Sequence, residues 1–407
     1  MEGYKYLKLQ KNVVCRSCDL TVSVTQIKKH YDCICPRCGR RLLSNNLVKE
    51  GDVAIVAFAA LIFLFISIIE PFMSISAMGT GAAMSLNSIV SILNKQWGSL
   101  LYVFLFFTFF APVSVLALIV FIGGFRFKPN IFLAKFYQFN HGMCMVDVFV
   151  LGIVVSLIKL TALADVTFYV GFYTTFIFSV LMIWCCLKFN PSILWEKIKK
   201  QSELKLIAGK SAMSQSYKVC QECGYVFKAN DDIDLCPRCK SKVAYRRKNC
   251  ISKSLALLLS ALILYLPSNL YPVMYTEFIG SNTGSNIIEG VIEMWQMNSY
   301  FVSFVILLAS IFIPAFKIIS MLFILYATKY SKIVVNKRVS RLYRFVLFIG
   351  RWSLIDVYVV IIMSSIVKIG NILNIEPGFA IICFCSVVII TVFSAEAFDE
   401  RLIWNKG

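Results

Sequence analysis

Eight cysteines of this sequence occur as CxxC pairs, and the pairs come in two sets. In each set, twelve to sixteen residues separate the two pairs, which is typical of a zinc ribbon with four thiolate ligands. The metal requires two tight turns whose thiolates converge tetrahedrally at about 2.3 Å from the ion. The predicted ligands are Cys15, Cys18, Cys35 and Cys38 in the first set, and Cys220, Cys223, Cys236 and Cys239 in the second.

Other uses of paired cysteines fit this pattern less well. A redox CxxC needs one exposed thiol of low pKa, whereas these pairs come as matched sets of two. Disulfides are disfavoured in the cytosol, where the charge pattern below places both sets. Iron could occupy the same thiolates, and His30 and Cys33 lie close enough to substitute as ligands. Because four protein ligands leave no open coordination position, we expect a structural metal.

The elements that position these cysteines are membrane helices. Of the 407 residues, 58% are hydrophobic and only 15% are charged, which is too apolar for a soluble fold. Several apolar runs reach the length of about 20 residues that a bilayer core requires, and helices satisfy their own backbone groups in lipid. The eight predicted spans are 53–74, 99–122, 143–164, 166–188, 254–274, 300–327, 353–371 and 376–397.

The positive residues predict which loops face the cytosol. All but five of the 41 Lys and Arg residues lie before the first span, after the second, fourth and sixth spans, or at the C-terminus. This bias predicts that both termini and the long central segment are cytosolic. It also explains the net charge of +19 without a nucleic-acid partner. The N-terminal segment has no apolar core before a cleavage site, so no signal peptide is expected.

Ordered landmarks indicate an internal duplication. The matching positions are Cys35 and Cys236, Pro71 and Pro272, Pro112 and Pro314, Asp147 and Asp356, and Lys159 and Lys368. Four spans per unit predict a parallel repeat about an axis along the membrane normal. The fold class is therefore an all-α polytopic membrane protein of two tandem four-helix repeats, each preceded by a small cytosolic zinc ribbon. The predicted domains are 1–50 (ribbon), 51–190 (first helical unit), 191–250 (linker and second ribbon) and 251–407 (second helical unit).

Ionisable residues inside spans are costly, so each is a functional candidate. The candidate transport path comprises Asp147, Lys159, Lys317, Asp356 and Lys368. The twelve-residue step from each Asp to its Lys rotates a helix by about 120°, so the two do not share a face. The alternative is that the aspartates cap helix starts and the lysines snorkel outward. Lys317 stands where the first half has Val115, so the halves are not equivalent.

The doubled order of ribbon and spans, with MVDVFV (145–150) and LIDVYV (354–359), resembles the paraquat-inducible protein A family. That family includes the inner-membrane protein of the lipophilic envelope-spanning tunnel system. The resemblance implies a bacterial inner-membrane protein that hands phospholipid to or from a periplasmic MCE-domain tunnel partner. It also implies two zinc ions bound by the eight ribbon cysteines, and tetraspanin-like helical units.

Three functions are compatible with these features. The first is the lipid-transport subunit, with a lysine attracting the lipid phosphate as a point charge. The second is a proton- or ion-coupled small-molecule transporter, which intramembrane charges suit equally well. The third is a redox membrane protein with iron in the ribbons. An enzyme is not expected, because IAGKS (207–211) lacks the first glycine of a phosphate-binding loop and only His30 and His141 are available.

Overall fold

The computed structural model describes most of the chain, and seven of its described helices are long and apolar enough to cross a membrane. These seven are Glu50–Ile69, Leu101–Gly124, Ile131–Leu157, Val170–Lys188, Cys250–Leu270, Ser303–Tyr330 and Phe379–Ala397. The described residues are 6–28, 31–44, 50–77, 80–85, 89–91, 94, 98–125, 127–161, 165–202, 204–229, 235–278, 281–296, 298, 300–330, 336–352, 355–366 and 373–404.

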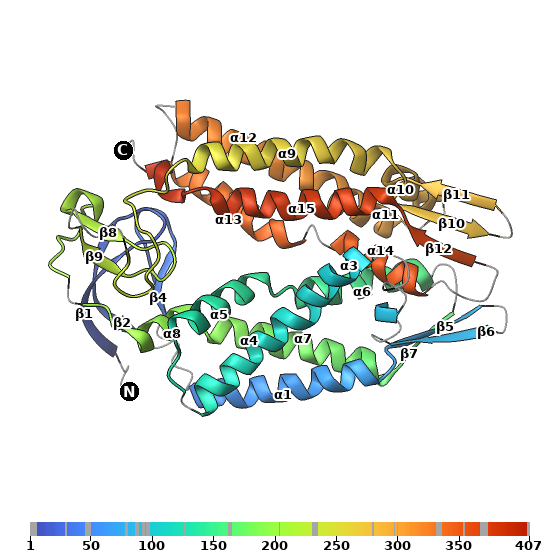
Figure 1. Ribbon diagram of the computed structural model, residues 1–407, viewed down its shortest axis with the longest axis horizontal. Coiled ribbons are helices and arrows are strands. Elements are labelled where there is room, and N and C mark those ends of the chain that lie inside the picture. The colour runs from blue at the N-terminus through green and yellow to red at the C-terminus, as the bar shows by residue number, and fades with distance from the viewer. Residues whose placement is uncertain are drawn as a thin grey trace.

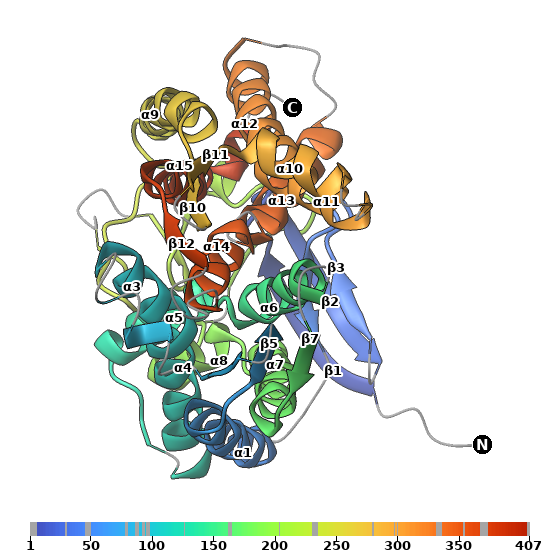
Figure 2. The ribbon, with the colours of Figure 1, turned by 90° about the vertical axis from the view of Figure 1, so that its right-hand side faces the viewer.

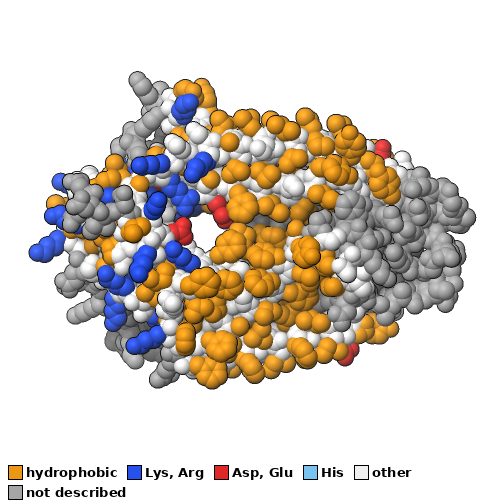
Figure 3. Space-filling model, viewed as in Figure 1, with side chains coloured by type: hydrophobic (Ala, Val, Ile, Leu, Met, Phe, Trp, Pro, Cys, Tyr) orange, Lys and Arg blue, Asp and Glu red, His pale blue; other side chains and the backbone are white. Residues whose placement is uncertain are grey.

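The helices run side by side in two groups, one from each half of the chain (Figure 1). Short strands that carry the cysteines lie at one end, together with both termini; we call this the ribbon end. Two small sheets lie at the opposite, sheet end. On the face shown in Figure 3, exposed apolar side chains cover the middle of the molecule, and Lys and Arg gather at the ribbon end. A lipid-facing belt with basic residues at one side is typical of a membrane protein.

The two halves have parallel element orders. The first runs α1 (Glu50–Ile69), β5 (Met73–Ala77), β6 (Thr80–Met84), α3 (Gly98–Leu105), η1 (Phe106–Phe110), α4 (Ala111–Ile119), η2 (Val120–Gly124), α5 (Ile131–Met143), α6 (Val146–Thr161), β7 (Asp165–Phe168), α7 (Val170–Lys188) and α8 (Pro191–Ile198). The second runs α9 (Cys250–Leu270), β10 (Met274–Phe278), β11 (Ser281–Ser285), α10 (Ile287–Gln296), α11 (Tyr300–Leu307), η4 (Leu308–Phe312), α12 (Ile313–Tyr330), α13 (Asn336–Trp352), α14 (Ile355–Ile366), β12 (Leu373–Pro377), α15 (Phe379–Ala397) and η5 (Glu400–Trp404).

The third predicted span of each half differs from the structure. It is preceded by another helix, α5 or α13, that the hydropathy pattern did not predict. In the first half Cys144 takes an extended conformation between α5 and α6, although together they form one membrane-long stretch. In the second half, α13 carries four arginines that alternate with apolar residues. Its mean hydropathy is therefore too low for an apolar run to be recognised. The described part of α14 is too short to count as a membrane span. The total of eight spans therefore stays a prediction.

A strand lies between the third and fourth predicted spans of each half. β7 pairs with β5 to complete the sheet β6-β5-β7, and β12 pairs with β10 to complete β11-β10-β12. All these pairings are antiparallel. Apolar strand residues had lengthened the predicted spans, so that the fourth was expected from residue 166 whereas α7 begins at Val170.

In each half, the sheet brings the start of the fourth predicted span (α7 or α15) against the end of the first (α1 or α9). The backbone N–H of Gly171 donates to the carbonyl of Pro71 (3.2 Å), and that of Gly378 donates to Val273 (2.7 Å). A Cβ atom on Gly171 would lie 2.5 Å from the Pro71 oxygen, and one on Gly378 would lie 2.2 Å from the Pro272 oxygen. Only glycine permits this approach.

Replacing Gly378 by alanine is therefore expected to destabilise the protein by about 1–3 kcal/mol, because backbone must move to admit the methyl group. Gly51→Ala is the matched control, since a Cβ atom there meets nothing within 4 Å. Thermal unfolding of the detergent-purified variants measures the difference. Equal melting of the two variants would contradict the close approach.

The two halves meet through α6 and α14, which lie side by side at the centre of the molecule (Figure 2). The helices come so close that a Cβ atom on Gly152 would lie 2.8 Å from Cβ of Tyr358. Tyr358 is buried, makes edge-to-face contacts with Phe104 and Phe149, and accepts a hydrogen bond from Thr108 (3.5 Å). This apolar contact joins the halves away from the ribbon end.

Candidate metal centres and intramembrane charges

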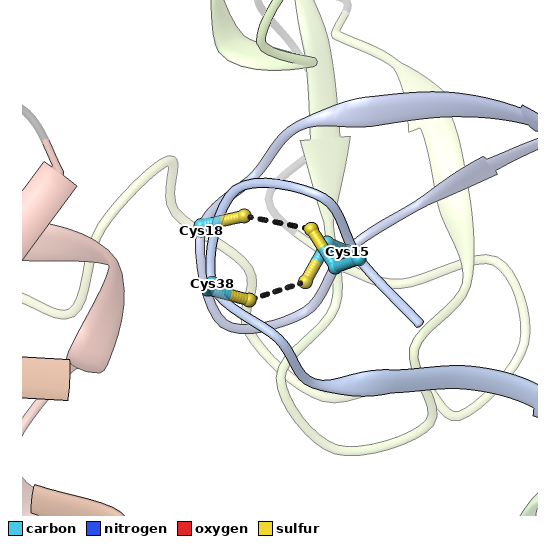
Figure 4. Close-up of side chains that lie close together, drawn as sticks. Cys15, Cys18 and Cys38 are labelled. Carbon is cyan, nitrogen blue, oxygen red and sulfur yellow. Dashed lines mark hydrogen bonds between the residues drawn. The ribbon is translucent and has the colours of Figure 1, made fainter. Parts of the chain in front are cut away.

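The first four-cysteine centre lies between two hairpins. Cys15 and Cys18 occupy the turn between β1 (Tyr6–Val14) and β2 (Thr21–Lys28), and Cys35 and Cys38 occupy the turn between β3 (Asp32–Ile34) and β4 (Arg41–Ser44). The N–H groups of Asp19 and Gly39 donate to Cys15 and Cys35, at 2.9 Å each. Both residues have positive φ, which closes each turn tightly enough to direct two thiols to one point (Figure 4).

The second centre repeats this geometry. Cys220 and Cys223 lie between β8 (Tyr217–Val219) and β9 (Val226–Lys228), and Cys236 and Cys239 lie in a later turn. The N–H groups of Gly224 and Lys240, again with positive φ, donate to Cys220 and Cys236 at 2.9 Å. The shorter connector predicted from the sequence therefore leaves the paired turns intact.

The sulfur atoms of each set fit around one metal ion. Within each set the four Sγ atoms lie within 4.8 Å of one another, and the closest pairs are 3.5 Å apart. Sulfurs bound tetrahedrally at about 2.3 Å would be about 3.8 Å apart, whereas a disulfide bond is about 2.05 Å long. All eight cysteines are buried and free. Both sets could therefore hold a metal ion.

Electrostatics favour a cation in each centre. Hydrogen bonds with Cys15 and Cys38, and then burial, raise the pKa of the Cys18 thiol. Hydrogen bonds with Cys220 and Cys236, and then burial, raise the pKa of the Cys223 thiol in the same way. Four thiolates cannot share such a site without a compensating positive charge, and metal binding supplies it.

Of the two suggested substitute ligands, the structure describes only Cys33. Cys33 lies in β3, half-buried, and does not belong to the group formed by its neighbours. His30 lies outside the described residues.

Each ribbon packs on the helical half that does not directly follow it in the sequence, and we call this arrangement crossed. The first ribbon contacts the second half of the chain: Arg344 of α13 donates to the carbonyl of Cys38 (2.6 Å), and the Arg37 guanidinium lies 4.9 Å from the Trp404 ring centre. Its four cysteines share an apolar cluster with residues of α9, α12, α13 and α15.

The second ribbon contacts the first half. The Lys199 ammonium, just after α8, lies 5.6 Å from the ring centre of Tyr225. Gln201 donates to the carbonyl of Val226 (2.7 Å). The four cysteines of this ribbon share an apolar cluster with residues of α1, α4, α5, α7 and α8, including Trp195. Each ribbon therefore braces the helical half that is not the next one along the chain.

The ribbons also contact each other. Arg16 donates to the carbonyl of Cys223 (3.1 Å), and Asp19 forms an ion pair with Arg246 (3.3 Å). The linker after α8 runs along the first ribbon, where the N–H of Thr21 donates to Lys210 (2.9 Å). The two candidate centres thus form one continuous unit.

Residues Asp399–Trp404, which we call the C-terminal clasp, hold both ribbons. Toward the first ribbon, Glu400 forms an ion pair with Arg40 (3.6 Å). Toward the second, Arg401 donates to the carbonyl of Val219 (3.4 Å) and Asp399 accepts from Gln221 (3.3 Å). Asp399 and Arg401 form a buried ion pair at 3.1 Å. Burial alone would raise the pKa of Asp399, but the hydrogen bond and charge of Arg401 hold it below its ordinary value.

The sequence did not identify the arginines that contact the cysteine turns. Arg16 and Arg344 each donate to a carbonyl of a candidate ligand residue in the other half of the chain. In the sequence they are indistinguishable from the many basic residues that set topology. Only their position beside CxxC turns of the folded protein gives them this role.

The candidate intramembrane charges lie in different surroundings. Lys317 is only 2% exposed, and its amine has no hydrogen-bond partner among the described residues. It faces the space beside Gly350 of α13, because a Cβ atom there would lie 3.8 Å from the lysine Nζ. Asp147 is half-buried in the first turn of α6.

The side chains of the other three candidates are not described by the structure. Lys159 lies in α6 and Asp356 in the first turn of α14, but their side chains are outside the described set. Lys368 lies outside the described residues altogether.

Lys317 follows a local irregularity that both halves share. The π-helices η1 and η4 each precede an α-helix with proline at its second position, Pro112 in α4 and Pro314 in α12. Proline removes a backbone donor and clashes with the preceding turn, and the wider π-turn relieves that clash. Val115 of α4 is fully buried at the position matching Lys317. The buried amine therefore distinguishes the two halves.

Seven described helices that are long and apolar enough to cross a membrane, with two four-cysteine ribbons at one end, define a multi-pass membrane protein with paired candidate metal centres. The family model described as Paraquat-inducible protein A matches residues 52–199 and 251–407. The chain belongs to the paraquat-inducible protein A family.

Several curated proteins are similar over nearly the whole chain. The intermembrane transport protein PqiA of Escherichia coli (strain K12) is 32% identical over 97% of this chain and 96% of its own length. A probable intermembrane transport protein of Haemophilus influenzae is 28% identical over 97% and 96%. The lipophilic envelope-spanning tunnel protein A of Escherichia coli (strain K12) is 25% identical over 96% and 90%. No solved structure matches the chain significantly.

Proposed function

We propose that this protein is the inner-membrane subunit of an intermembrane lipid transport system, handing phospholipid between the inner membrane and a periplasmic MCE-domain tunnel protein. The observation that carries the proposal is similarity over 97% of the chain to a relative named an intermembrane transport protein. A relative named for an envelope-spanning tunnel is similar over 96% of the chain. We propose no catalytic activity.

The proposed topology has both termini and both ribbons in the cytosol and the sheets in the periplasm. The gathering of Lys and Arg at the ribbon end supports this orientation (Figure 3). The parallel element orders support two tandem four-helix repeats of eight spans. The proposed domains remain 1–50, 51–190, 191–250 and 251–407.

We propose that each ribbon binds one structural zinc ion through its four cysteines. The thiol-only donor set and the separations of the sulfur atoms fit zinc, and a closed site leaves no position for a substrate. Because the crossed ribbons join both helical halves at the ribbon end, the metals would fix how the halves sit relative to each other. Arg16 and Arg344 would hold the turns that carry the ligands.

The proposed transport path follows the intramembrane charges Asp147, Lys159, Lys317, Asp356 and Lys368. Lys317 is the best-supported member, because its buried amine has no hydrogen-bond partner among the described residues, and a charged amine in a membrane span is costly unless an anion lies beside it. A phospholipid phosphate has the chemistry to provide it, as a point-charge contact. A proton- or ion-coupled small-molecule transporter is the alternative, since the same amine could bind an anionic solute.

Lys317→Met tests the proposed path, because methionine keeps the volume while removing the amine. In proteoliposomes with the periplasmic partner, the variant is expected to transfer fluorescent phospholipid at least about tenfold more slowly, equivalent to about 1.4 kcal/mol of lost phosphate binding. Lys253→Met, on the exposed first turn of α9, should transfer at the wild-type rate.

Wild-type lipid transfer by the Lys317→Met protein would remove this residue from the path. Flux of a soluble anion without the partner, lost in Lys317→Met, would instead favour the small-molecule transporter.

A further inference from the structure

Helix α10 (Ile287–Gln296) has three distinct faces. The first face packs on the protein: Ile287 is buried in the central apolar cluster, and Val291 and Met294 are half-buried. Ser303 of α11 donates to the carbonyl of Val291 (2.8 Å), which fixes the helix against the start of the sixth predicted span. The position and rotation of α10 are therefore set by its contacts.

The second face is apolar but uncovered by protein. Ile288, Ile292 and Trp295 are each about half exposed. At about 100° per residue these three side chains fall within one arc of about 60°, next to the packed face. A water-facing helix of a soluble protein would carry polar residues in this arc.

The third face is acidic and polar. Glu289, Glu293 and Gln296 are exposed and follow the apolar arc around the helix. Asn286 and Glu289 form a reciprocal capping box: the N–H of Glu289 donates to Asn286 (2.9 Å), and the N–H of Asn286 donates to Glu289 (2.8 Å). The cap makes α10 a stable helix with its acidic side fixed next to its apolar side.

The uncovered apolar face continues an exposed apolar row on a candidate membrane span. Trp295 stacks edge-to-face on Tyr300 with ring centres 4.8 Å apart. From Tyr300, the exposed row Phe304, Leu308 and Phe312 runs along the span that α11, η4 and α12 form. α10 therefore lies where this row reaches the sheet end (Figure 1), which is the depth expected for the headgroups.

We infer that α10 is an interfacial helix that inserts Ile288, Ile292 and Trp295 into the lipid leaflet at the sheet end and turns Glu289 and Glu293 toward water. Trp and Tyr prefer this depth because their rings are amphipathic. No Lys or Arg occurs between residues 281 and 296, so insertion depends on apolar burial and not on anionic headgroups. The inference needs only that the chain spans a bilayer, and it does not rest on lipid transport.

The test uses the full chain in vesicles of phosphatidylcholine with brominated tails. The fluorescence of Trp295 is obtained as the difference between the fluorescence of the wild-type protein and that of the Trp295→Phe variant. The two proteins must melt at the same temperature. Bromines near the headgroups should roughly halve this signal, since about half of the side chain faces lipid, and deep bromines should quench it less. Added anionic lipid should change nothing.

Ile292→Glu should remove most of the quenching, whereas Glu293→Gln should retain it. An unquenched Trp295 signal would show that α10 faces water and would overturn the inference. Stronger quenching by deep bromines would overturn the interfacial depth. If the periplasmic partner abolished the quenching, the face would be a protein-docking site, and the inference would be wrong for the complex.

Discussion

A Cys38→Ser protein is expected to bind one metal ion fewer than the wild-type chain and to release the first ribbon from α13. Four thiolates converge in this centre, and a hydroxyl is a poor replacement for one of them. Structural zinc contributes about 10–16 kcal/mol of apparent binding energy to a small fold at pH 7. No apolar contact of so small a ribbon approaches that value, so loss of the ion should unfold it.

Metal-to-protein ratios by elemental analysis check this expectation, together with labelling of Cys15, Cys18 and Cys35 by a thiol reagent. These three buried thiols should become reactive in Cys38→Ser. Cys33→Ser is the matched control, because Cys33 lies in the same ribbon but outside the centre. A wild-type protein that contains no metal, or an unchanged ratio in Cys38→Ser, would refute the assignment.

Arg401→Ala is expected to destabilise the ribbon end by about 3–5 kcal/mol. Arg401 is 2% exposed, and its partner Asp399 would be left as an unpaired buried charge. The same change removes the hydrogen bond to Val219, next to a candidate ligand of the second centre. Since Glu400 of the clasp also holds Arg40 of the first ribbon, both centres should become more accessible.

Thermal unfolding and the rate of thiol labelling at Cys220 and Cys15 measure this effect. Arg41→Ala is the control, because the ion pair of Arg41 with Asp32 is exposed and contributes about 0–1 kcal/mol. Adding Asp399→Asn to Arg401→Ala should recover part of the lost stability, as the uncompensated charge is then absent. If Arg401→Ala melted like Arg41→Ala, the clasp would not hold the ribbons.

The tertiary structure gives the ribbons a role that their sequence positions do not suggest. Each ribbon braces the helical half that is not next along the chain, and the clasp joins both ribbons to the end of α15. Loss of either metal is therefore expected to loosen the contact between the halves at the ribbon end, while α6 and α14 keep them together elsewhere.

The sequence by itself determined the two sets of cysteines that could hold a metal ion, most of the candidate membrane spans, the basic ribbon end and the family. Each of these is a local or periodic pattern: thiol spacing closes a turn, and apolar length matches a bilayer. The tertiary structure alone decided the crossing of the ribbons and the arginine contacts to Cys38 and Cys223. It also decided the burial of Lys317. These depend on contacts between residues up to several hundred positions apart, which no local pattern encodes.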